Sequence, residues 1–311
     1  MSITKHQYIL KSLRKIAHKE WESFIVSRII HGLDDDDIEF VTQQLVRFPN
    51  GKRALTDLYF PQFEIHVEVD EPHHEKEDSV KDDERREQDI IQTTDHKIMR
   101  VKIADESEQL RSLSEIRNDV DNLIKDIAAR KQNSVRNGDF IPWDLDLRYS
   151  SDPVIKRGYL SIDDNVVFKT QVEALRCFGF QGKGYQRGGW IIPDGSHDEV
   201  WFPRLYQHGM WHNELADQGR EIIERASSDD PALKAEAVSS IAKQRERGGQ
   251  HPDKKYIVFA KARDALGFNL LRYVGSFKMN FEDITADELR FERVSTKEDV
   301  RKLSKRREDD K

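Results

Sequence analysis

The sequence predicts a two-domain protein in which an α/β unit is followed by a strand-rich α+β unit. The chain has 311 residues, which is more than a single hydrophobic core usually needs. Its first part alternates helical and strand patterns, and its last part contains a series of short strand patterns. Between them, residues 136–153 lack clear periodicity and are rich in turn-forming residues. We therefore expect domains at 1–135 and 154–311, joined by a linker.

The first domain is expected to follow the order helix, strand hairpin, helix, strand, helix. A polar turn at Asp34–Asp37 separates a long first helix from a short second one. The expected helices are Gln7–Gly32, Ile38–Leu45, Asp78–Thr94 and Leu110–Lys131. The expected strands are Lys52–Phe60, Phe63–Asp70 and His96–Ile103, the first two being paired.

The second domain is expected to contain mostly short strands, with a few helices between them. The helical patterns are a short segment that ends near Cys177, then Glu214–Ala226 and Pro231–Arg245. The strand patterns are Tyr159–Leu160, Asn165–Phe168, Trp190–Ile192, Glu199–Leu205, Tyr256–Ala262, Asn269–Met279 and Leu289–Val294.

Composition narrows the class of protein. The formal net charge is -7, which argues against a histone-like DNA binder but permits a local basic groove. A single cysteine, Cys177, excludes an intrachain disulfide and fits a reducing cytoplasm. No apolar run is long enough to span a bilayer, and the N-terminus lacks the apolar core of a signal peptide. We therefore expect a cytoplasmic protein with no membrane partner.

An acidic cluster on the predicted strand pair carries the main functional signal. Asp57 lies on the first strand, Glu68 and Asp70 lie on the second, and His73 and His74 follow it. Because strand residues alternate between faces, Glu68 and Asp70 should share one face. Carboxylates gathered in this way can hold a divalent cation against a phosphate, and a histidine can act as general base. The alternative is that these polar residues only cap an exposed strand end.

These residues also carry a resemblance to a known family. The segments Asp57–Pro61, Val67–His74 and Asp83–Arg86 resemble the Vsr-like branch of the PD-(D/E)XK nucleases. They are more similar still to the AbaSI-like, hydroxymethylcytosine-dependent restriction endonucleases, and the similarity extends over almost the whole chain. The chain departs from the broad superfamily pattern because Asp70 stands where a lysine is usual, which favours the histidine-using Vsr-like branch.

The resemblance implies roles for these residues. Asp57 would be the principal ligand of Mg²⁺ or Mn²⁺, Glu68 and Asp70 its acidic partners, and His73 or His74 the base. The family also uses a glutamate of the first helix near the metal. Two candidates are open, Glu22 and Glu20, and the string Trp21-Glu22-Ser23-Phe24 favours Glu22. A surface glutamate in a charge pair is an equally good interpretation of either residue.

The segment Trp201–Asn213 resembles part of the SRA-like domain of the same endonucleases. An enzyme that tests a base inside a duplex must extrude it into a pocket with an aromatic wall and polar edge readers. The resemblance places Trp211 and Asn213 in this pocket, with Glu224 and Asp230 as less certain partners. Each residue also has a structural interpretation. Trp211 could be core and Glu224 surface, while Asn213 and Asp230 could cap helices.

Phosphate contacts are expected from the basic residues between Lys254 and Arg272, which interleave with aromatic residues. Asp83 and Arg86 are expected to form structural ion pairs, although Arg86 could instead contact a phosphate.

The sequence therefore predicts a modification-dependent type IV restriction endonuclease of a bacterial cytoplasm. It would flip a hydroxymethylated cytosine, with or without a glucose, and cut double-stranded DNA at a distance, in defence against phage. One site per chain and two strands to cut predict a homodimer. The alternatives are a Vsr-like nicking endonuclease of mismatch repair and a modified-base reader that does not cut.

Overall fold

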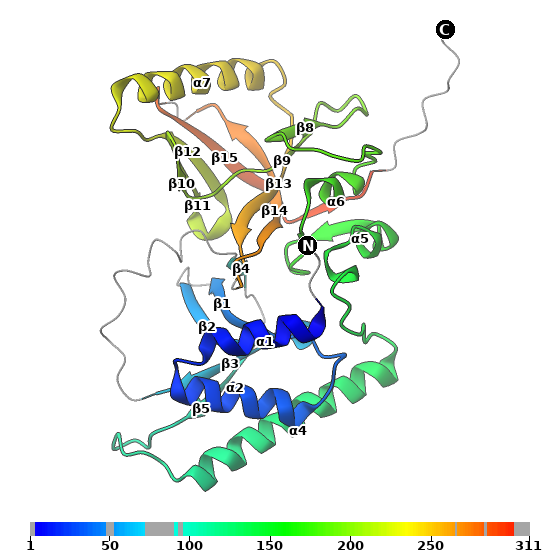
Figure 1. Ribbon diagram of the computed structural model, residues 1–311. Coiled ribbons are helices and arrows are strands. Elements are labelled where there is room, and N and C mark those ends of the chain that lie inside the picture. Colours follow the sequence, from blue (N-terminus) through cyan, green and yellow to red (C-terminus); the bar gives the residue numbers. More distant parts are fainter. Residues whose placement is uncertain are drawn as a thin grey trace. The chain divides into compact units, whose positions relative to one another are not determined.

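The computed structural model of the protein (Figure 1) describes residues 4–47, 53–71, 90–92, 96–264, 266–282 and 285–301. Contacts within the chain divide it into two units. The first is Met1–Leu145, and the second comprises most of the chain from Asp146 onward. Among the residues described, no helix combines the length and the apolar character that crossing a membrane requires.

A five-stranded sheet forms the centre of the first unit, in the order β4-β1-β2-β3-β5. Its strands are β1 (Val41–Arg47), β2 (Arg53–Phe60), β3 (Ile65–Asp70), β4 (Ile90–Gln92) and β5 (Lys97–Lys102). The three strands β1, β2 and β3 pair in antiparallel fashion, while β4 and β5 pair in parallel with β1 and β3. The predicted strand hairpin and the strand that follows it are confirmed.

Two predicted helices of this unit are wrong where the structure describes them. Val41–Arg47 is a strand rather than part of a helix, and Ile90–Gln92 is a strand within the expected helix Asp78–Thr94. Residues 42–46 are all buried, because β1 lies inside the sheet between β2 and β4. Three of these buried residues, Thr42, Gln43 and Gln44, are polar. Polar residues at buried positions hide the apolar pattern by which a strand is recognised in a sequence.

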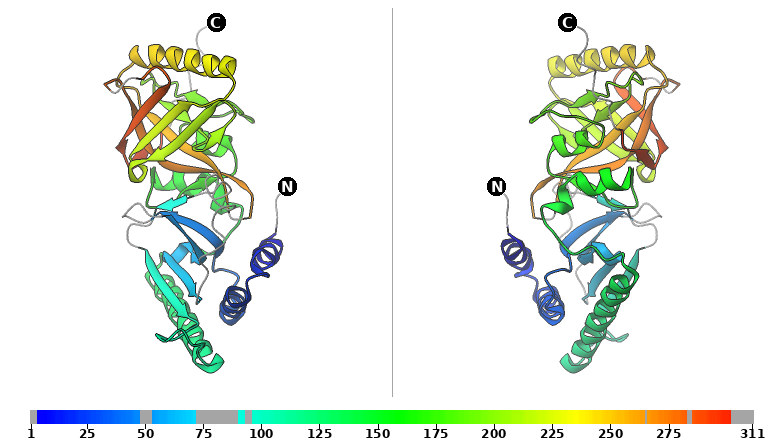
Figure 2. Two further views of the ribbon diagram at one scale, coloured as in Figure 1. Left: turned by 90° about the vertical axis from the view of Figure 1, so that its left-hand side faces the viewer. Right: turned by 90° about the vertical axis from the view of Figure 1, so that its right-hand side faces the viewer.

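Three helices accompany the sheet of the first unit. The expected long first helix is two helices, α1 (Lys5–Ile16) and α2 (Glu20–Leu33), on one side of the sheet in Figure 2. A capping box at Thr4 begins α1. The third helix, α4 (Leu113–Asn137), contacts α2 and β5. An ion pair between Arg28 and Asp121, 2.7 Å long, joins α2 to α4.

The expected linker, residues 136–153, is ordered. Trp143 is buried against Tyr8 and Phe40 of the first unit, with ring centroids 5.3 and 6.1 Å away. The amide of Gln62 donates to the carbonyl of Ile141 at 2.7 Å. A 3-10 turn, η2 (Leu147–Tyr149), and helix α5 (Asp152–Arg157) then begin the second unit.

A second sheet forms most of the second unit, in the order β10-β11-β12-β15-β14-β13-β9-β8, with β7 paired to β14. Its strands are β7 (Val167–Phe168), β8 (Gly189–Ile191), β9 (Glu199–Trp201), β10 (Gln207–His208), β11 (Trp211–Ala216), β12 (Glu221–Ala226), β13 (Tyr256–Arg263), β14 (Asn269–Asn280) and β15 (Glu288–Ser295). A separate pair joins β6 (Tyr159–Ser161) to β16 (Lys297–Asp299). Helix α6 (Gln171–Arg176) precedes β8, and α7 (Pro231–Gly249) contacts β12 and β15.

The expected helix Glu214–Ala226 is wrong, because this segment contains the end of β11, a turn and β12. The turn Asp217–Gly219 makes the reversal possible, since all three residues have left-handed backbone angles, with φ of 44°, 56° and 86°. Glutamate-rich strands with helix-forming residues conceal this hairpin in the sequence. The later helix and the three strands after it are confirmed.

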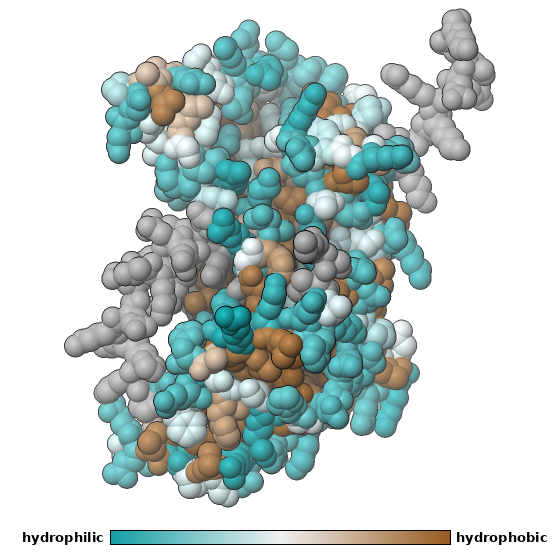
Figure 3. Space-filling model, in the orientation of Figure 1, coloured by the Kyte–Doolittle hydropathy of each residue, from teal (hydrophilic) through white to brown (hydrophobic). Residues whose placement is uncertain are grey.

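Two clusters of buried residues form the core of the second unit, and Cys177 belongs to one of them. Burial raises the pKa of the Cys177 thiol to about 12, so this residue is a structural thiol rather than a nucleophile. Figure 3 shows one face of the molecule, where hydrophobic side chains are also visible over α1 and α2 of the first unit.

Candidate active site and base-recognition site

Asp57 lies where the ladder between β2 and β3 ends. The last paired residues are Leu58 and Val67. Beyond them, the Asp57 side chain replaces a main-chain acceptor, because its Oδ2 accepts the backbone N–H of Val69 at 2.7 Å. This bond fixes one carboxylate oxygen against β3 and leaves the other for a different partner.

Glu22 is the first-helix glutamate that lies beside Asp57. Glu22 is 3% exposed, whereas Glu20 is exposed on α2. The amide nitrogen of Gln43 on β1 donates to Oε1 of Glu22 at 2.5 Å and to Oδ1 of Asp57 at 3.3 Å. Lys19 forms an ion pair with Glu22 at 2.7 Å. The structure therefore brings Glu22 and Asp57 together through one shared donor.

Burial shifts the pKa of both carboxylates upward. Burial, and then the charge of the neighbouring Asp57 carboxylate, raise the pKa of Glu22 to about 7, although Lys19 acts in the opposite direction. Burial likewise raises the pKa of Asp57, with a smaller contribution from the charge of Glu68. A buried and a half-buried carboxylate that resist ionisation form a site that a divalent cation would stabilise in the charged form.

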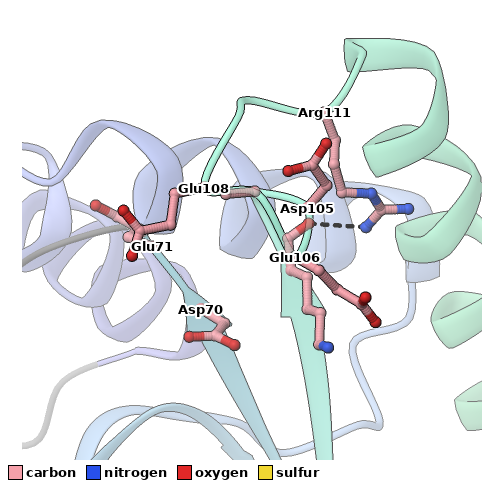
Figure 4. Close-up of a pocket in the computed structure, with 8 residues that line it drawn as sticks. Asp70, Glu71, Asp105, Glu106, Glu108 and Arg111 are labelled. Atoms are coloured by element: carbon pink, nitrogen blue, oxygen red, sulfur yellow. Dashed lines mark hydrogen bonds between the residues drawn. The ribbon is translucent and has the colours of Figure 1, made fainter.

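Glu68 and Asp70 lie near this pair but have other surroundings. Glu68 forms an ion pair with Arg100 of β5 at 2.9 Å. Asp70, at the end of β3, lines a cavity of about 390 Å³ (Figure 4). The other residues that line the cavity are mostly acidic: Glu71, Lys102, Ala104, Asp105, Glu106, Glu108 and Arg111.

The carboxylates of this cluster are suitable ligands for a divalent cation, but the described residues do not supply a complete set of ligands. Within that part, no three side chains of histidine, cysteine, aspartate or glutamate lie close enough together to form a metal site. The predicted bases His73 and His74, and also Asp83 and Arg86, lie outside the described residues. Asp57 and Glu22, with Glu68 acting on Asp57 through its charge, are the residues that could begin to hold Mg²⁺ or Mn²⁺.

His66 belongs to the core rather than to the acidic cluster. It is fully buried, its Nδ1 lies 3.2 Å from the hydroxyl of Thr56, and its Nε2 lies 2.8 Å from Nδ1 of His96. The ring also stacks on Tyr59, with centroids 4.3 Å apart. Burial, and then the neighbouring His96, lower the pKa of His66 to about 3, so this imidazole is neutral at physiological pH.

Two of the residues predicted for the base pocket form a buried polar pair on adjacent strands. Asn213 on β11 stands directly opposite Glu224 on β12, and its amide nitrogen donates to Oε1 of Glu224 at 3.1 Å. The two residues are 3% and 8% exposed. Burial raises the pKa of Glu224 to about 7, although the Asn213 amide acts in the opposite direction. Both residues lie on strands, so the helix-cap and helix-surface interpretations do not apply.

The amide oxygen of Asn213 is buried without a hydrogen-bond partner among the described residues. Such a group is costly unless a ligand or water satisfies it. Trp211, also on β11, is half-buried against the neighbouring core cluster. Asp230 has a structural role, since its carboxylate caps α7 by accepting the N–H groups of Ala232 and Leu233. Its membership of the pocket stays a prediction.

The basic residues expected to contact phosphates differ in whether their side chains are buried or already paired with other residues. Lys254 forms an ion pair with Glu199 at 2.6 Å. Arg272 is only 5% exposed and donates to the carbonyl of Asn165, so the expectation of a phosphate contact is wrong for this residue. Lys261 on β13 stands opposite Arg204, and burial together with the charge of Arg204 lowers the pKa of Lys261.

Sequence reasoning did not identify Lys19 and Gln43 as neighbours of the acidic cluster. Lys19 had a usable signal, because it lies three residues before Glu22 in a helical pattern. Gln43 had none, since it falls in the segment expected to be helical.

Comparisons with known proteins agree with this architecture. A family described as restriction endonuclease PvuRts1 I-like, N-terminal, matches residues 6–128. A second family, the SET and RING associated domain, matches residues 153–300. No curated protein matches the chain.

Among solved structures, the chain is similar to the 5-hydroxymethylcytosine-specific restriction enzyme AbaSI. The TM-score is 0.80 and the sequence identity is 34%, over 96% of this chain and 98% of that one. The similarity covers nearly the whole of both chains, so it includes both the nuclease-like unit and the SRA unit. The chain therefore belongs to the family of AbaSI-like, 5-hydroxymethylcytosine-dependent restriction endonucleases.

Proposed function

We propose that this protein recognises 5-hydroxymethylcytosine, with or without a glucose, in double-stranded DNA and then hydrolyses phosphodiester bonds at a distance from it. The role would be defence against phage in the cytoplasm of a bacterium. Reading and cutting are assigned to separate units, which is why the cut would lie away from the modified base. A homodimer would cut both strands.

The observation that carries the specificity is the buried pair Asn213–Glu224 with its unsatisfied amide oxygen. The exocyclic amine of cytosine is a hydrogen-bond donor, and an amide oxygen or a carboxylate accepts from it. Such groups reach the base only after it leaves the stack, so recognition requires flipping. Trp211 would provide a face for the flipped base, and Asp230 is retained as a less certain partner.

Cutting is assigned to the acidic cluster of the first unit. Asp57, Glu68 and Asp70 would hold Mg²⁺ or Mn²⁺, with Glu22 beside them, and His73 or His74 would accept a proton from the attacking water. A bound cation would supply the charge that polarises the scissile phosphate and lowers the pKa of that water. Val69 orients Asp57 through its N–H, and Arg100 does the same for Glu68 through its guanidinium.

A digest of matched phage DNAs tests the proposal. The DNAs carry cytosine, methylcytosine, hydroxymethylcytosine or glucosylated hydroxymethylcytosine, each with and without magnesium. We expect magnesium-dependent cutting of the hydroxymethylated forms and none of plain cytosine. The variant Asp57→Ala should bind hydroxymethylated DNA without cutting it.

Two outcomes would contradict different parts of the proposal. If the wild type with magnesium leaves hydroxymethylated DNA intact, the proposed activity is wrong. If every form of cytosine is cut equally, the recognition role of Asn213 and Glu224 is wrong, while the nuclease assignment stands.

A further inference from the structure

Gln43 has a backbone conformation that a strand does not normally permit. Its φ is +56°, in the left-handed region that favours glycine. The neighbouring pairs Thr42–Leu58 and Gln44–Thr56 place it opposite Asp57 in the β1–β2 ladder. A non-glycine residue persists in this region only where its surroundings demand it, and such residues gather at functional sites.

The contacts of the Gln43 side chain explain why this residue keeps a left-handed backbone conformation. Its amide nitrogen donates to Glu22 at 2.5 Å and to Asp57 at 3.3 Å, and its amide oxygen accepts from Nζ of Lys19 at 3.1 Å. The residue is 7% exposed, so these bonds form with little competition from water. One side chain thus connects the helix, the first strand and the second strand at the acidic cluster.

Glutamine suits this place for a chemical reason. Glu22 is buried and Asp57 is half-buried. Their carboxylates repel each other, and a neutral amide donor between them reduces that repulsion without adding a further charge that a cation would have to displace. A glutamate would add a third acid, and an aliphatic side chain would leave both oxygens without this donor. Hydrogen bonds of this kind orient metal ligands and are important for affinity.

We propose that Gln43 is a positioning residue that holds Glu22 and Asp57 in place for the divalent cation. It contacts neither DNA nor the reacting atoms in this role. The inference rests on the proposed metal-dependent cutting and names the residue that prepares the site for it. The second Asp57 oxygen, held by the N–H of Val69, completes the fixed geometry.

The test measures the affinity of the full-length protein for Mn²⁺ by titration calorimetry. Two variants remove the amide in different ways. Gln43→Met keeps the length of the side chain, and Gln43→Gly accepts the left-handed backbone without strain. Gln44→Ala is the matched control, because Gln44 is the next buried glutamine on β1 and its amide donates to the carbonyl of Leu45.

Both Gln43 variants should weaken Mn²⁺ binding by about 10- to 100-fold, the usual effect of removing a group that orients metal ligands. Cutting should recover at saturating Mn²⁺, and the dissociation constant for hydroxymethylated DNA without metal should not change. Gln44→Ala should lower the melting temperature but leave the Mn²⁺ affinity unaltered.

Two negative results are distinguishable. If the wild type binds Mn²⁺ and Asp57→Asn does not, yet both Gln43 variants bind like the wild type, the positioning role is wrong and the metal site stands. If the wild type and Asp57→Asn bind Mn²⁺ equally weakly, the proposed metal site is wrong, and the role of Gln43 falls with it.

Discussion

Two glutamates of one helix differ in their surroundings, and this difference decides which one serves the acidic cluster. Glu22 is buried and bonded to Gln43 and Lys19, whereas Glu20 is exposed. We expect Glu22→Gln to reduce magnesium-dependent cutting of hydroxymethylated DNA by about 10- to 100-fold, because it removes a charge beside Asp57. Glu20→Gln is the matched control and should stay within roughly twofold of the wild type, as surface substitutions usually do. Initial rates at several magnesium concentrations measure both. An equal loss in the two variants would contradict the assignment.

Glu224 makes the stability of the protein depend on pH. Its pKa is raised from 4.5 to about 7 by burial, so the folded state binds a proton that the unfolded chain releases at lower pH. The free energy of unfolding should therefore fall as pH rises from about 4.5 to about 7 and then level off. The contribution of this group is up to about 3 kcal/mol, at about 1.4 kcal/mol for each unit of pKa.

Denaturant unfolding at pH 5 and at pH 8 checks this expectation. The free energy of unfolding should be lower at pH 8 than at pH 5, and Glu224→Gln should remove most of the part of this difference that Glu224 contributes. Glu236→Gln, on the exposed face of α7, should retain it. A Glu224→Gln protein with the same pH dependence as the wild type would show that Glu224 ionises normally in the folded state.

At the level of elements, the sequence predicts strands well where β-branched and aromatic residues dominate, and poorly where polar or helix-forming residues occupy the strand. The hairpin β2–β3 was predicted because its apolar positions and its Pro61 turn are both visible in the sequence. The strand β1 was not, since the polar residues Thr42, Gln43 and Gln44 form its buried centre. The hairpin β11–β12 was not predicted, since the segment around Glu214 and Glu221 is rich in helix-forming residues. Only the left-handed turn between the two strands prevents a helix there.

The same errors limited the prediction of the site. Asp57 and Glu68 stand out in the sequence because they are acids on a recognisable strand pair. Gln43 does not, because its importance arises from a ladder partner in a strand mistaken for a helix. Asn213 and Glu224 were proposed as pocket residues by resemblance, but only the antiparallel register places them opposite each other. Contacts between strands distant in sequence are the part that periodicity cannot supply.

Lys261 on β13 differs in its surroundings from Lys254, which precedes that strand. Lys261 stands beside another cation, Arg204, whereas Lys254 is neutralised by Glu199. Two adjacent cations favour a phosphate between them. We expect Lys261→Ala to weaken DNA binding equally for modified and plain duplexes and to reduce the dependence of log K on log salt by about 1.

Fluorescence anisotropy over a range of salt concentrations measures that slope. Lys254→Ala is the control, and its slope should match the wild type. If Lys261→Ala instead weakens only the binding of hydroxymethylated DNA, the side chain acts in base recognition and the phosphate role is wrong.

For the molecule as a whole, recognition and cutting should be separable by mutation, since each depends on its own unit. Asp57, Glu22 and Gln43 belong to the first unit, and Asn213 and Glu224 to the second. Loss of Asp57 should abolish cutting, and loss of Glu22 or Gln43 should weaken it, without affecting selective binding. Loss of the second should abolish selectivity and leave metal binding intact.

One acidic cluster per chain has a further consequence for the assembly. A double-strand break needs two hydrolytic events on opposite strands, so two copies of the chain should act together. A hybrid tests this directly. Wild type and Asp57→Asn chains carrying different tags are produced together and purified through both tags in turn, which isolates assemblies containing one of each.

On a supercoiled plasmid with hydroxymethylated sites, the hybrid should accumulate nicked circles, while the wild type produces linear DNA at the same concentration. Recovery of no material after the second tag would show that the chains do not associate on their own, and the hybrid would then be formed on DNA before purification. If the hybrid, once isolated, gives linear DNA without nicked circles, a single active site cuts both strands. The proposed homodimer would then be unnecessary for cleavage, because the one intact cluster around Asp57 would have to serve each strand in turn.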